Sequence, residues 1–131
     1  MGEFENVVIY KLAFRSEFIP DVTQDMLDKI ASRAQVYNQR RGITGTLLYN
    51  DKKILQFLEG GRAEITRLYH RIRPDPRHYN IKLIGVFLMR ERSFTDSYLD
   101  IKLISKTSML DTIDTLYGIQ KLPGNHIIVA A

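Results

Sequence analysis

The sequence predicts a single α+β domain in which a mixed β-sheet carries helices on one face. Its 131 residues suffice for one domain with a hydrophobic core. Hydrophobic residues make up 44% and charged residues 26% of the chain, which is a globular rather than a disordered composition. Segments rich in β-formers alternate with segments of helical periodicity in the order βαββαββ, and this order is the ferredoxin-like pattern.

The first strand and the first helix are expected near the N-terminal end. Residues 7–14 are mostly apolar on both faces and rich in β-formers, which indicates a central strand. Apolar residues at helical spacing then predict a helix over 23–40. Either Thr23 alone, or Asp21 together with Gln24, is suited to cap the start of this helix.

A hairpin, a second helix and two further strands follow. Strands are predicted over 44–49 and 54–58, joined by a short polar connection. An apolar helical pattern over 65–72 ends before two prolines. Residues 81–89 form another β-rich run, and residues 99–103 alternate apolar and charged side chains, as a strand with one solvated face does. We expect both helices on one face of the sheet.

A third, amphipathic helix is predicted over 108–117, with Ser108 and Asp111 as a capping pair and Gly118 at its end. Its apolar stripe consists of Met109, Leu110, Ile113, Leu116 and Tyr117. A helix this short is marginal in water on its own, so we expect it to pack on the bare face of the sheet or of a neighbouring subunit. An exposed partner site is the alternative. In the tail, residues 127–129 could add an edge strand.

Two amide side chains fall on faces that are otherwise apolar. Asn38 follows Leu27 and Ala34 on the inner side of the first helix, and Gln56 shares a strand face with Leu58. An inward amide must find partners, because leaving it unpaired costs roughly 1–3 kcal/mol. Backbone groups, or the two amides themselves, could supply these partners. Alternatively, the pair indicates a pocket for a planar heterocycle edged with carbonyls and ring nitrogens.

The sequence carries no pattern typical of an enzyme. It has no cysteine, and its three histidines show no metal-ligand spacing. No arginine loop that would cradle a phosphate supports the remote alternative, an acylphosphatase-like enzyme. The net charge is +4, and we interpret the arginine cluster over 67–77 as a solvated helix face, so nucleic-acid binding is not expected. No apolar run is long enough for a membrane span, and a cytoplasmic protein is the default.

Four stretches of the chain form a fairly specific combination. They are GITGTLLY at 42–49, LQFLEG at 55–60, the segment 69–78, and RERSF at 90–94. Together they resemble the BLUF family, the sensors of blue light using FAD, with nearly gapless spacing over 7–104. The resemblance implies the ferredoxin-like sheet already predicted, with a flavin (FAD or FMN) held between the two helices.

The resemblance also implies roles for four residues. Gln56 falls on the family's switching glutamine, which bonds the flavin edge on its N5 and C4-carbonyl side. Asn38 falls on a flavin-contacting asparagine at the end of the first helix. Arg71 and Asp75 fall on an arginine and an aspartate near the isoalloxazine. The two amides found from periodicity are therefore also the two that the resemblance places at the cofactor.

Four positions depart from the family pattern. The photoactive tyrosine, which gives an electron and a proton to the excited flavin, falls at Phe14, and phenylalanine has no hydroxyl to transfer. Tyr10 lies on the same strand face, but four residues along a strand is roughly 13 Å. Tyr37 replaces the first of two paired asparagines, and Ser97 and Leu99 stand where a tryptophan and a methionine are common. We therefore predict an impaired photocycle.

The expected organisation is a BLUF-like domain at 7–104, followed by a C-terminal helix and tail at 105–131. We expect a regulatory or sensory module, not an enzyme, with no appended output domain. Such a module acts through a protein partner or through homo-oligomerisation. The alternative is a cofactor-free interaction or adaptor protein with the same fold, its pocket filled by its own side chains.

Overall fold

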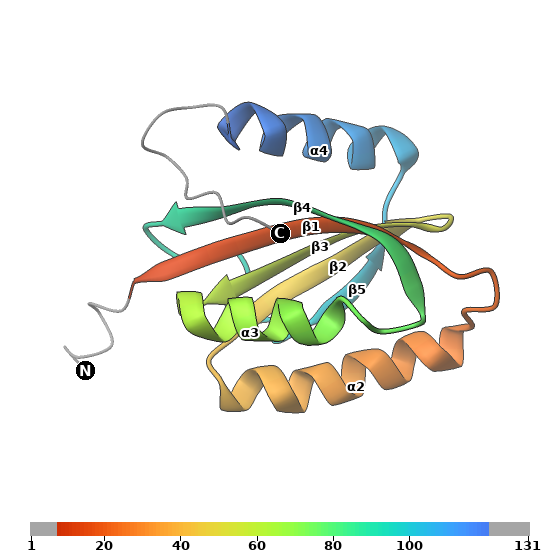
Figure 1. The fold of residues 1–131 in the computed structure, drawn as a ribbon, viewed down its shortest axis with the longest axis horizontal. Helices are drawn as coiled ribbons and strands as arrows, with labels where there is room; N and C mark the ends of the chain where they lie inside the picture. Colours follow the sequence, from red (N-terminus) through yellow and green to blue (C-terminus); the bar gives the residue numbers. More distant parts are fainter. Residues whose placement is uncertain (1–7, 121–131) are drawn as a thin grey trace.

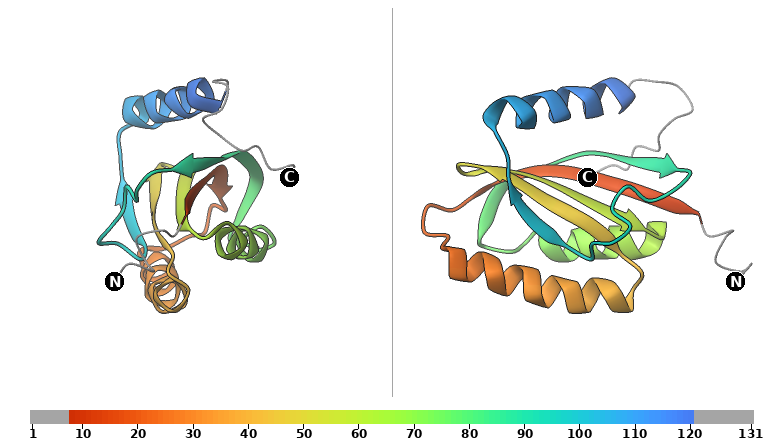
Figure 2. Two further views of the ribbon diagram at one scale, coloured as in Figure 1. Left: turned by 90° about the vertical axis from the view of Figure 1, so that its left-hand side faces the viewer. Right: turned by 180° about the vertical axis from the view of Figure 1, so that it is seen from behind.

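The computed structural model describes residues 8–120, and a five-stranded sheet lies at its centre. The strands are β1 (Ile9–Phe18), β2 (Thr44–Asn50), β3 (Lys53–Gly60), β4 (His78–Met89) and β5 (Asp100–Leu103), and the helices are α2 (Gln24–Arg40), α3 (Arg62–Ile72) and α4 (Lys106–Gln120). Helices α2 and α3 cover one face of the sheet, and α4 covers the other (Figure 1). End-on and reverse views show α2 and α3 side by side below the sheet, with α4 alone above it (Figure 2).

The strand order is β4-β1-β3-β2-β5. The first four strands of this order form an antiparallel, ferredoxin-like sheet. The fifth strand, β5, pairs in parallel with β2 and makes the sheet mixed. The predicted α+β, ferredoxin-like fold with two helices on one face is therefore confirmed.

The edge strand β4 pairs irregularly with β1. One register shift lies between Ala13 and Phe14 of β1 and a second between Arg15 and Glu17, and each leaves an extra residue on β4. Near the second shift, Asn80 adopts a left-handed φ of 56°. Bulges of this kind interrupt the ladder and increase the local twist. They also let both strands continue into polar sequence, so β1 and β4 are longer than the runs predicted at 7–14 and 81–89.

The start of α2 settles the choice between its two predicted caps. The Thr23 hydroxyl accepts a hydrogen bond from the backbone N–H of Met26 at 3.2 Å. An N-cap oxygen of this kind satisfies one of the free N–H groups in the first turn. After the helix, Gly42 takes a φ of 65°, a conformation that favours glycine, and turns the chain into β2.

Helix α4 is longer than predicted and is capped differently. The Ser105 hydroxyl accepts from the backbone N–H of Ser108 at 3.0 Å, so the predicted capping pair of Ser108 and Asp111 is wrong. Gly118 lies inside the helix rather than at its end, since α4 runs from Lys106 to Gln120. The edge strand suggested for 127–129 lies outside the described residues.

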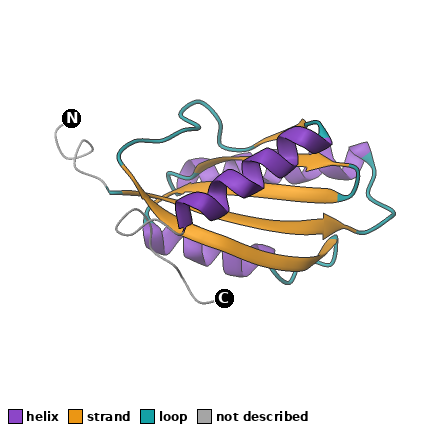
Figure 3. Ribbon diagram, turned by 90° about the horizontal axis from the view of Figure 1, so that it is seen from above, coloured by secondary structure: helices purple, strands orange, loops and turns teal. Residues whose placement is uncertain are grey.

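The prediction that the third helix docks on the sheet face opposite the other two is confirmed. Seen from above, α4 crosses over the strands (Figure 3). Its Met109 and Leu116 are buried, whereas Leu110 is 51% exposed and does not belong to the packed stripe. The sheet residues beneath the helix are Ala13, Leu55, Phe57, Ile84 and Phe87. None of the helices within residues 8–120 is long and apolar enough to cross a membrane.

Candidate functional site

A pocket of about 350 Å³ lies between the sheet and the pair of helices α2 and α3. This volume is at the lower end of the range for small-molecule sites. Its apolar lining comes from Phe18, Ile30, Ala34, Leu47, Ile54, Leu68, Ile72 and Leu99. Its polar lining comes from Arg33, Tyr37, Asn38, Gln56, Arg71, Asp75, Arg77 and His78. The pocket therefore brings all four predicted site residues to one place.

Asn38 is the most informative side chain in the pocket. It is 1% exposed, and its Nδ2 donates to the backbone oxygen of Tyr98 at 2.7 Å. Its Oδ1 is buried and has no hydrogen-bond donor among the described residues. The amide is thus fixed at one end and left unsatisfied at the other, which is an unusual state for a buried oxygen. A ligand with an N–H group would complete it.

Gln56 lines the same pocket as Asn38, from the surface of β3 that faces the helices. It is 7% exposed, and no hydrogen bond of its amide to another described residue is formed. The periodicity argument placed both amides between helix and sheet, and the structure confirms that placement. Their part in holding a cofactor stays a prediction.

Phe14 is the cross-strand neighbour of Gln56 and is 1% exposed. Its ring packs against Tyr69, with ring centroids 5.2 Å apart, and lies edge-on to His78 at 6.5 Å. Burial raises the pKa of Tyr69, with the Arg73 charge opposing this in part. The position next to the glutamine therefore holds an aromatic ring without a hydroxyl, in a packed environment.

At the mouth of the pocket, Tyr37 lies between two guanidinium groups. Arg41 stands 3.6 Å from the centroid of its ring and Arg71 stands 4.6 Å from it. Arginine stacks favourably on aromatic faces in this way. Arg71 thus bridges α3 to α2, and Tyr37 is one of the residues that line the pocket.

The carboxylate of Asp75 is engaged within the protein. It accepts from the backbone N–H of Arg77 at 2.9 Å and also receives hydrogen bonds from the Arg77 guanidinium. The side-chain hydrogen bonds from Arg77 hold the pKa of Asp75 below its usual value, although partial burial opposes them. Asp75 therefore positions Arg77 at the rim rather than presenting a free carboxylate.

Two further departures from the family pattern lie in different places. Leu99 is 2% exposed and lines the pocket. Ser97 does not line it: its hydroxyl donates to the backbone oxygen of Gly45 at 3.2 Å, and its own carbonyl accepts from the Gly45 N–H. Ser97 therefore fastens the segment before β5 to strand β2.

Sequence reasoning missed one polar contact at the pocket. His78 Nδ1 lies 2.9 Å from the hydroxyl of Ser16, and its Nε2 lies 2.8 Å from the backbone oxygen of Ile72. Because a carbonyl only accepts, Nε2 carries a proton and donates to Ile72. Ser16 shares a strand face with Phe14 by the period of two, so a longer prediction for the first strand would have found it.

A second hollow, of about 460 Å³, lies beneath the start of α4. Its polar groups already pair with one another. Glu17 accepts from Lys53 and from the Asn80 amide, each at 2.8 Å. Within the described residues, this hollow offers no buried polar atom without a partner, and it is not the better candidate for a ligand site.

The residues of the α2–α3 pocket fit a flavin. A flavin ring is flat and apolar over its faces, and its edge carries carbonyl oxygens, ring nitrogens and one imide N–H. The pocket offers apolar walls, a free amide at Gln56 and an acceptor without a donor at Asn38. The arginines at its rim suit the phosphate of a flavin nucleotide.

Comparisons with known proteins point to one family. The family described as "BLUF: Sensors of blue-light using FAD" matches residues 9–100. The blue light- and temperature-regulated antirepressor BluF of Escherichia coli is 36% identical over 70 residues, which is 53% of this chain and 17% of that protein. The photoactivated adenylate cyclase subunit beta of Euglena gracilis is 33% identical over 85 residues, which is 62% of this chain and 10% of that protein.

Solved structures agree with this match. The BlsA photo-activated state superposes with a TM-score of 0.71 at 29% identity, over 88% of this chain and 86% of that one. The dark state of BlrB, described as a BLUF protein, gives a TM-score of 0.71 at 28% identity, over 90% of this chain and 87% of that one. In contrast, the chain spans only a small part of the curated relatives, 17% and 10% of their lengths in the two cases above.

Proposed function

Because the chain belongs to the BLUF family of blue-light sensors that use FAD, we propose that it is a cytoplasmic sensory module that binds FAD or FMN and acts through contacts with other proteins. The observation that carries this proposal is the buried, unsatisfied Oδ1 of Asn38, a residue that lines one pocket together with Gln56. A native protein tolerates such an atom where a ligand completes it.

The described residues suggest how the cofactor would be held. Asn38 would accept from the imide N–H, and Gln56 would offer its amide to the ring edge. Arg71, which lines the pocket beside Tyr37, would lie near the flavin ring. When bound, the flavin supplies blue-light absorption and an excited state that accepts an electron. Leu99 and the other apolar residues exclude water from the ring.

Phe14 determines what the module can do with light. A hydroxyl next to Gln56 would supply the proton and electron that rearrange the glutamine, and Phe14 has none. We therefore propose that the protein binds flavin but does not undergo the small, reversible red shift of the family. Its regulatory state would then depend on whether flavin is bound rather than on light.

An absorption spectrum of the purified protein tests both parts. A yellow protein, either as purified or after incubation with FMN, supports flavin binding. Blue light should then produce no reversible red shift in the wild type, and a normal shift that relaxes in the dark would contradict the proposal. Phe14→Tyr should bring the protein closer to a light response. Phe57→Tyr adds a buried hydroxyl on the opposite face of the sheet and is the matched control.

The second candidate is a cofactor-free adaptor with the same fold. It is favoured by one observation, the Tyr37 ring held by two arginines across the mouth of the pocket. In that case, the protein stays colourless even after incubation with excess FMN. Tyr37→Asn, which restores the family's residue, should then open the pocket and allow flavin to bind.

A further inference from the structure

Positive charge is concentrated on one part of the surface. Residues 33–41 and 62–73 together contain seven arginines and one glutamate. The whole chain has 19 Lys and Arg residues and 15 Asp and Glu residues, so everything outside these two segments has 12 cationic and 14 acidic residues. The net charge of +4 therefore arises from the C-terminal half of α2 and from α3, and the remainder is slightly acidic.

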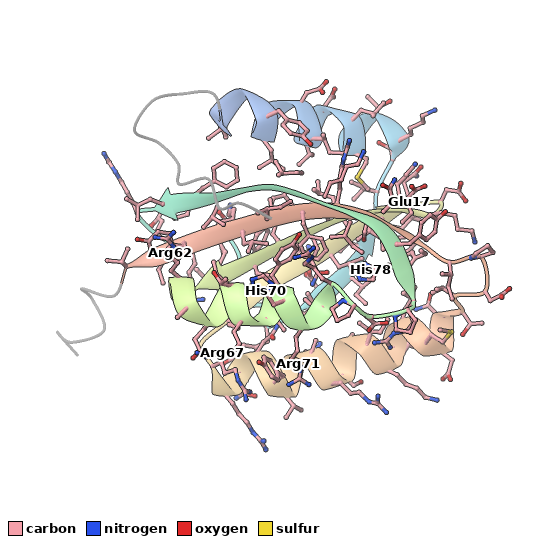
Figure 4. The ribbon with its side chains drawn as sticks, viewed as in Figure 1. Glu17, Arg62, Arg67, His70, Arg71 and His78 are labelled. Carbon is pink, nitrogen blue, oxygen red and sulfur yellow. The ribbon has the colours of Figure 1, made fainter. Side chains whose placement is uncertain are left out.

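Five exposed arginines of α2 and α3 form a surface around the pocket that Arg33 and Arg71 line, and we name this surface the arginine groove. Its members are Arg33, Arg40 and Arg41 from α2 and its C-cap, and Arg67 and Arg71 from α3. All five are exposed. Arg33, Tyr37 and Arg71 line the pocket directly below, and the labelled Arg67 and Arg71 lie on the side of α3 that faces α2 (Figure 4).

Helix geometry explains why the remaining members share this groove. Arg40 lies seven residues, or about two turns, after Arg33 and so falls on the same side of α2. Arg67 and Arg71 are one turn apart on α3. Glu64 pairs with Arg67 at 2.9 Å and is the only acidic side chain in the two segments. The groove therefore keeps a large excess of positive charge.

The composition of the groove indicates the kind of partner. Every cation in it is an arginine, and the guanidinium group suits paired hydrogen bonds to carboxylates and phosphates better than the lysine ammonium does. Its one aromatic side chain, Tyr37, has guanidinium groups on its ring from Arg41 and Arg71. The ring is therefore not available to stack on a nucleotide base, which single-stranded nucleic acids require.

We propose that the arginine groove is the docking surface for an acidic segment of a partner protein, rich in Asp and Glu. The inference rests on the proposed function in one respect, namely that the module acts through protein contacts. The partner's carboxylates would pair with Arg40 and Arg67 at the two sides of the groove. It would lie directly over the mouth of the flavin pocket, so a partner at this site senses whether the pocket is filled.

The test is a direct binding measurement with the whole chain. The probe is a short synthetic peptide of alternating glutamate and alanine, carrying a far-red dye so that flavin emission does not interfere. Fluorescence anisotropy should show binding that weakens steeply with added salt. The variant R40E/R67E should bind the peptide at least about tenfold more weakly, and R40Q/R67Q should be intermediate. Neither Arg40 nor Arg67 lines the flavin pocket.

The matched control is K29E/K102E. It makes the same charge change at two exposed lysines which, like Arg67, each pair with a carboxylate on their own element, but which lie outside the groove. Its affinity for the peptide should fall less than about threefold. Equal losses in the two double variants would overturn the proposal, because binding would then follow overall charge. Tighter binding of an oligothymidylate of equal charge would also overturn it.

Flavin binding is scored separately by absorbance, with and without the peptide. A protein that stays colourless but binds the peptide through the arginine groove would contradict the cofactor proposal and support the docking proposal. If the protein is yellow but its R40E/R67E variant binds the peptide as well as the wild type does, the result would support the cofactor proposal and contradict the docking proposal.

Discussion

Two buried polar side chains, one on each side of the sheet, differ in how well their oxygens are satisfied. On the face toward α4, Glu59 is 0% exposed and both of its carboxylate oxygens are satisfied. On the side toward α2 and α3, Asn38 is 1% exposed and its side-chain oxygen has no donor within residues 8–120. A satisfied buried charge stabilises the fold, whereas an unsatisfied buried amide lowers its stability.

The partners of Glu59 show what a purely structural polar site looks like. The backbone N–H groups of Ser93 and Phe94 donate to it at 2.8 Å, and the Lys11 ammonium lies 3.6 Å away. Burial lowers the pKa of Lys11, while the nearby Glu59 charge opposes this effect. This network ties the loop after β4 to the ends of β1 and β3.

The largest expected loss of stability therefore follows from a substitution of Glu59. Glu59→Ala leaves two backbone N–H groups and a largely buried ammonium without their partner, and it should lower the free energy of unfolding by about 3–5 kcal/mol. Urea denaturation followed by circular dichroism measures the change. Glu59→Gln keeps one acceptor oxygen and should cost less. A loss below about 1 kcal/mol for the alanine variant would mean that this face is not held by the carboxylate.

The next largest loss of stability is expected where α4 packs on the same face of the sheet. Met109→Ala removes a side chain that is 4% exposed between α4 and the sheet, and it should cost about 2–5 kcal/mol. Leu110→Ala changes the neighbouring residue, which is 51% exposed, and should cost less than about 0.5 kcal/mol. Thermal melting compares the two variants. Equal melting temperatures would show that α4 does not depend on this contact.

On the other face, Asn38→Leu should separate stability from ligand binding. The change removes the hydrogen bond to Tyr98 but also removes the unsatisfied oxygen, so the free energy of unfolding should move by less than about 1 kcal/mol. Flavin affinity, measured by equilibrium dialysis, should fall at least about tenfold.

A neighbouring glutamine provides the control for Asn38. Gln35 also donates to a backbone oxygen of the segment before β5, at 3.0 Å to Leu99, but it does not line the pocket. Gln35→Leu should therefore leave flavin affinity unchanged. If both variants bind flavin like the wild type, the unsatisfied oxygen of Asn38 is not a ligand contact.

The smallest expected effect is a pH-dependent contribution of the Asp75–Arg77 pair to the stability of the fold. The Arg77 hydrogen bonds hold the pKa of Asp75 below its usual value, so this pair stabilises the folded state at every pH above the usual range of an aspartate. The contribution is lost as the pH falls through the lowered pKa, because the carboxylate is then protonated. Asp75→Asn should lower stability by less than about 1 kcal/mol at neutral pH, and the difference should disappear in acid.

Periodicity and turn chemistry were enough to predict the fold and the two amides of the pocket. Asn38 and Gln56 were found because each breaks an apolar pattern with a known period. Glu59 could not be found this way, because its partners come from a loop that lies more than thirty residues later in the sequence. Ser97 was placed near the site by motif matching, but its backbone bonds hold it at strand β2.

The arginine cluster shows a different limit. Sequence reasoning interpreted the basic residues of 67–77 as a solvated helix face. The sequence does not show that Arg71 of α3 and Arg33 of α2 line one pocket, because this depends on how the two helices pack against each other. Each helix alone carries only a modest excess of positive charge. The charge becomes concentrated where α2 and α3 pack side by side.

The two bulges on β4 have a consequence for how copies of the protein meet. An edge strand of twelve residues is long enough to template another strand, and open edges of this length are a common route to aggregation. Here the ladder is interrupted twice, Asn80 turns the backbone into a left-handed conformation, and Lys82 adds charge. Such features discourage strand addition. Within residues 8–120, the two bulges and Lys82 therefore make β4 a poorer template for a further β-strand from another copy.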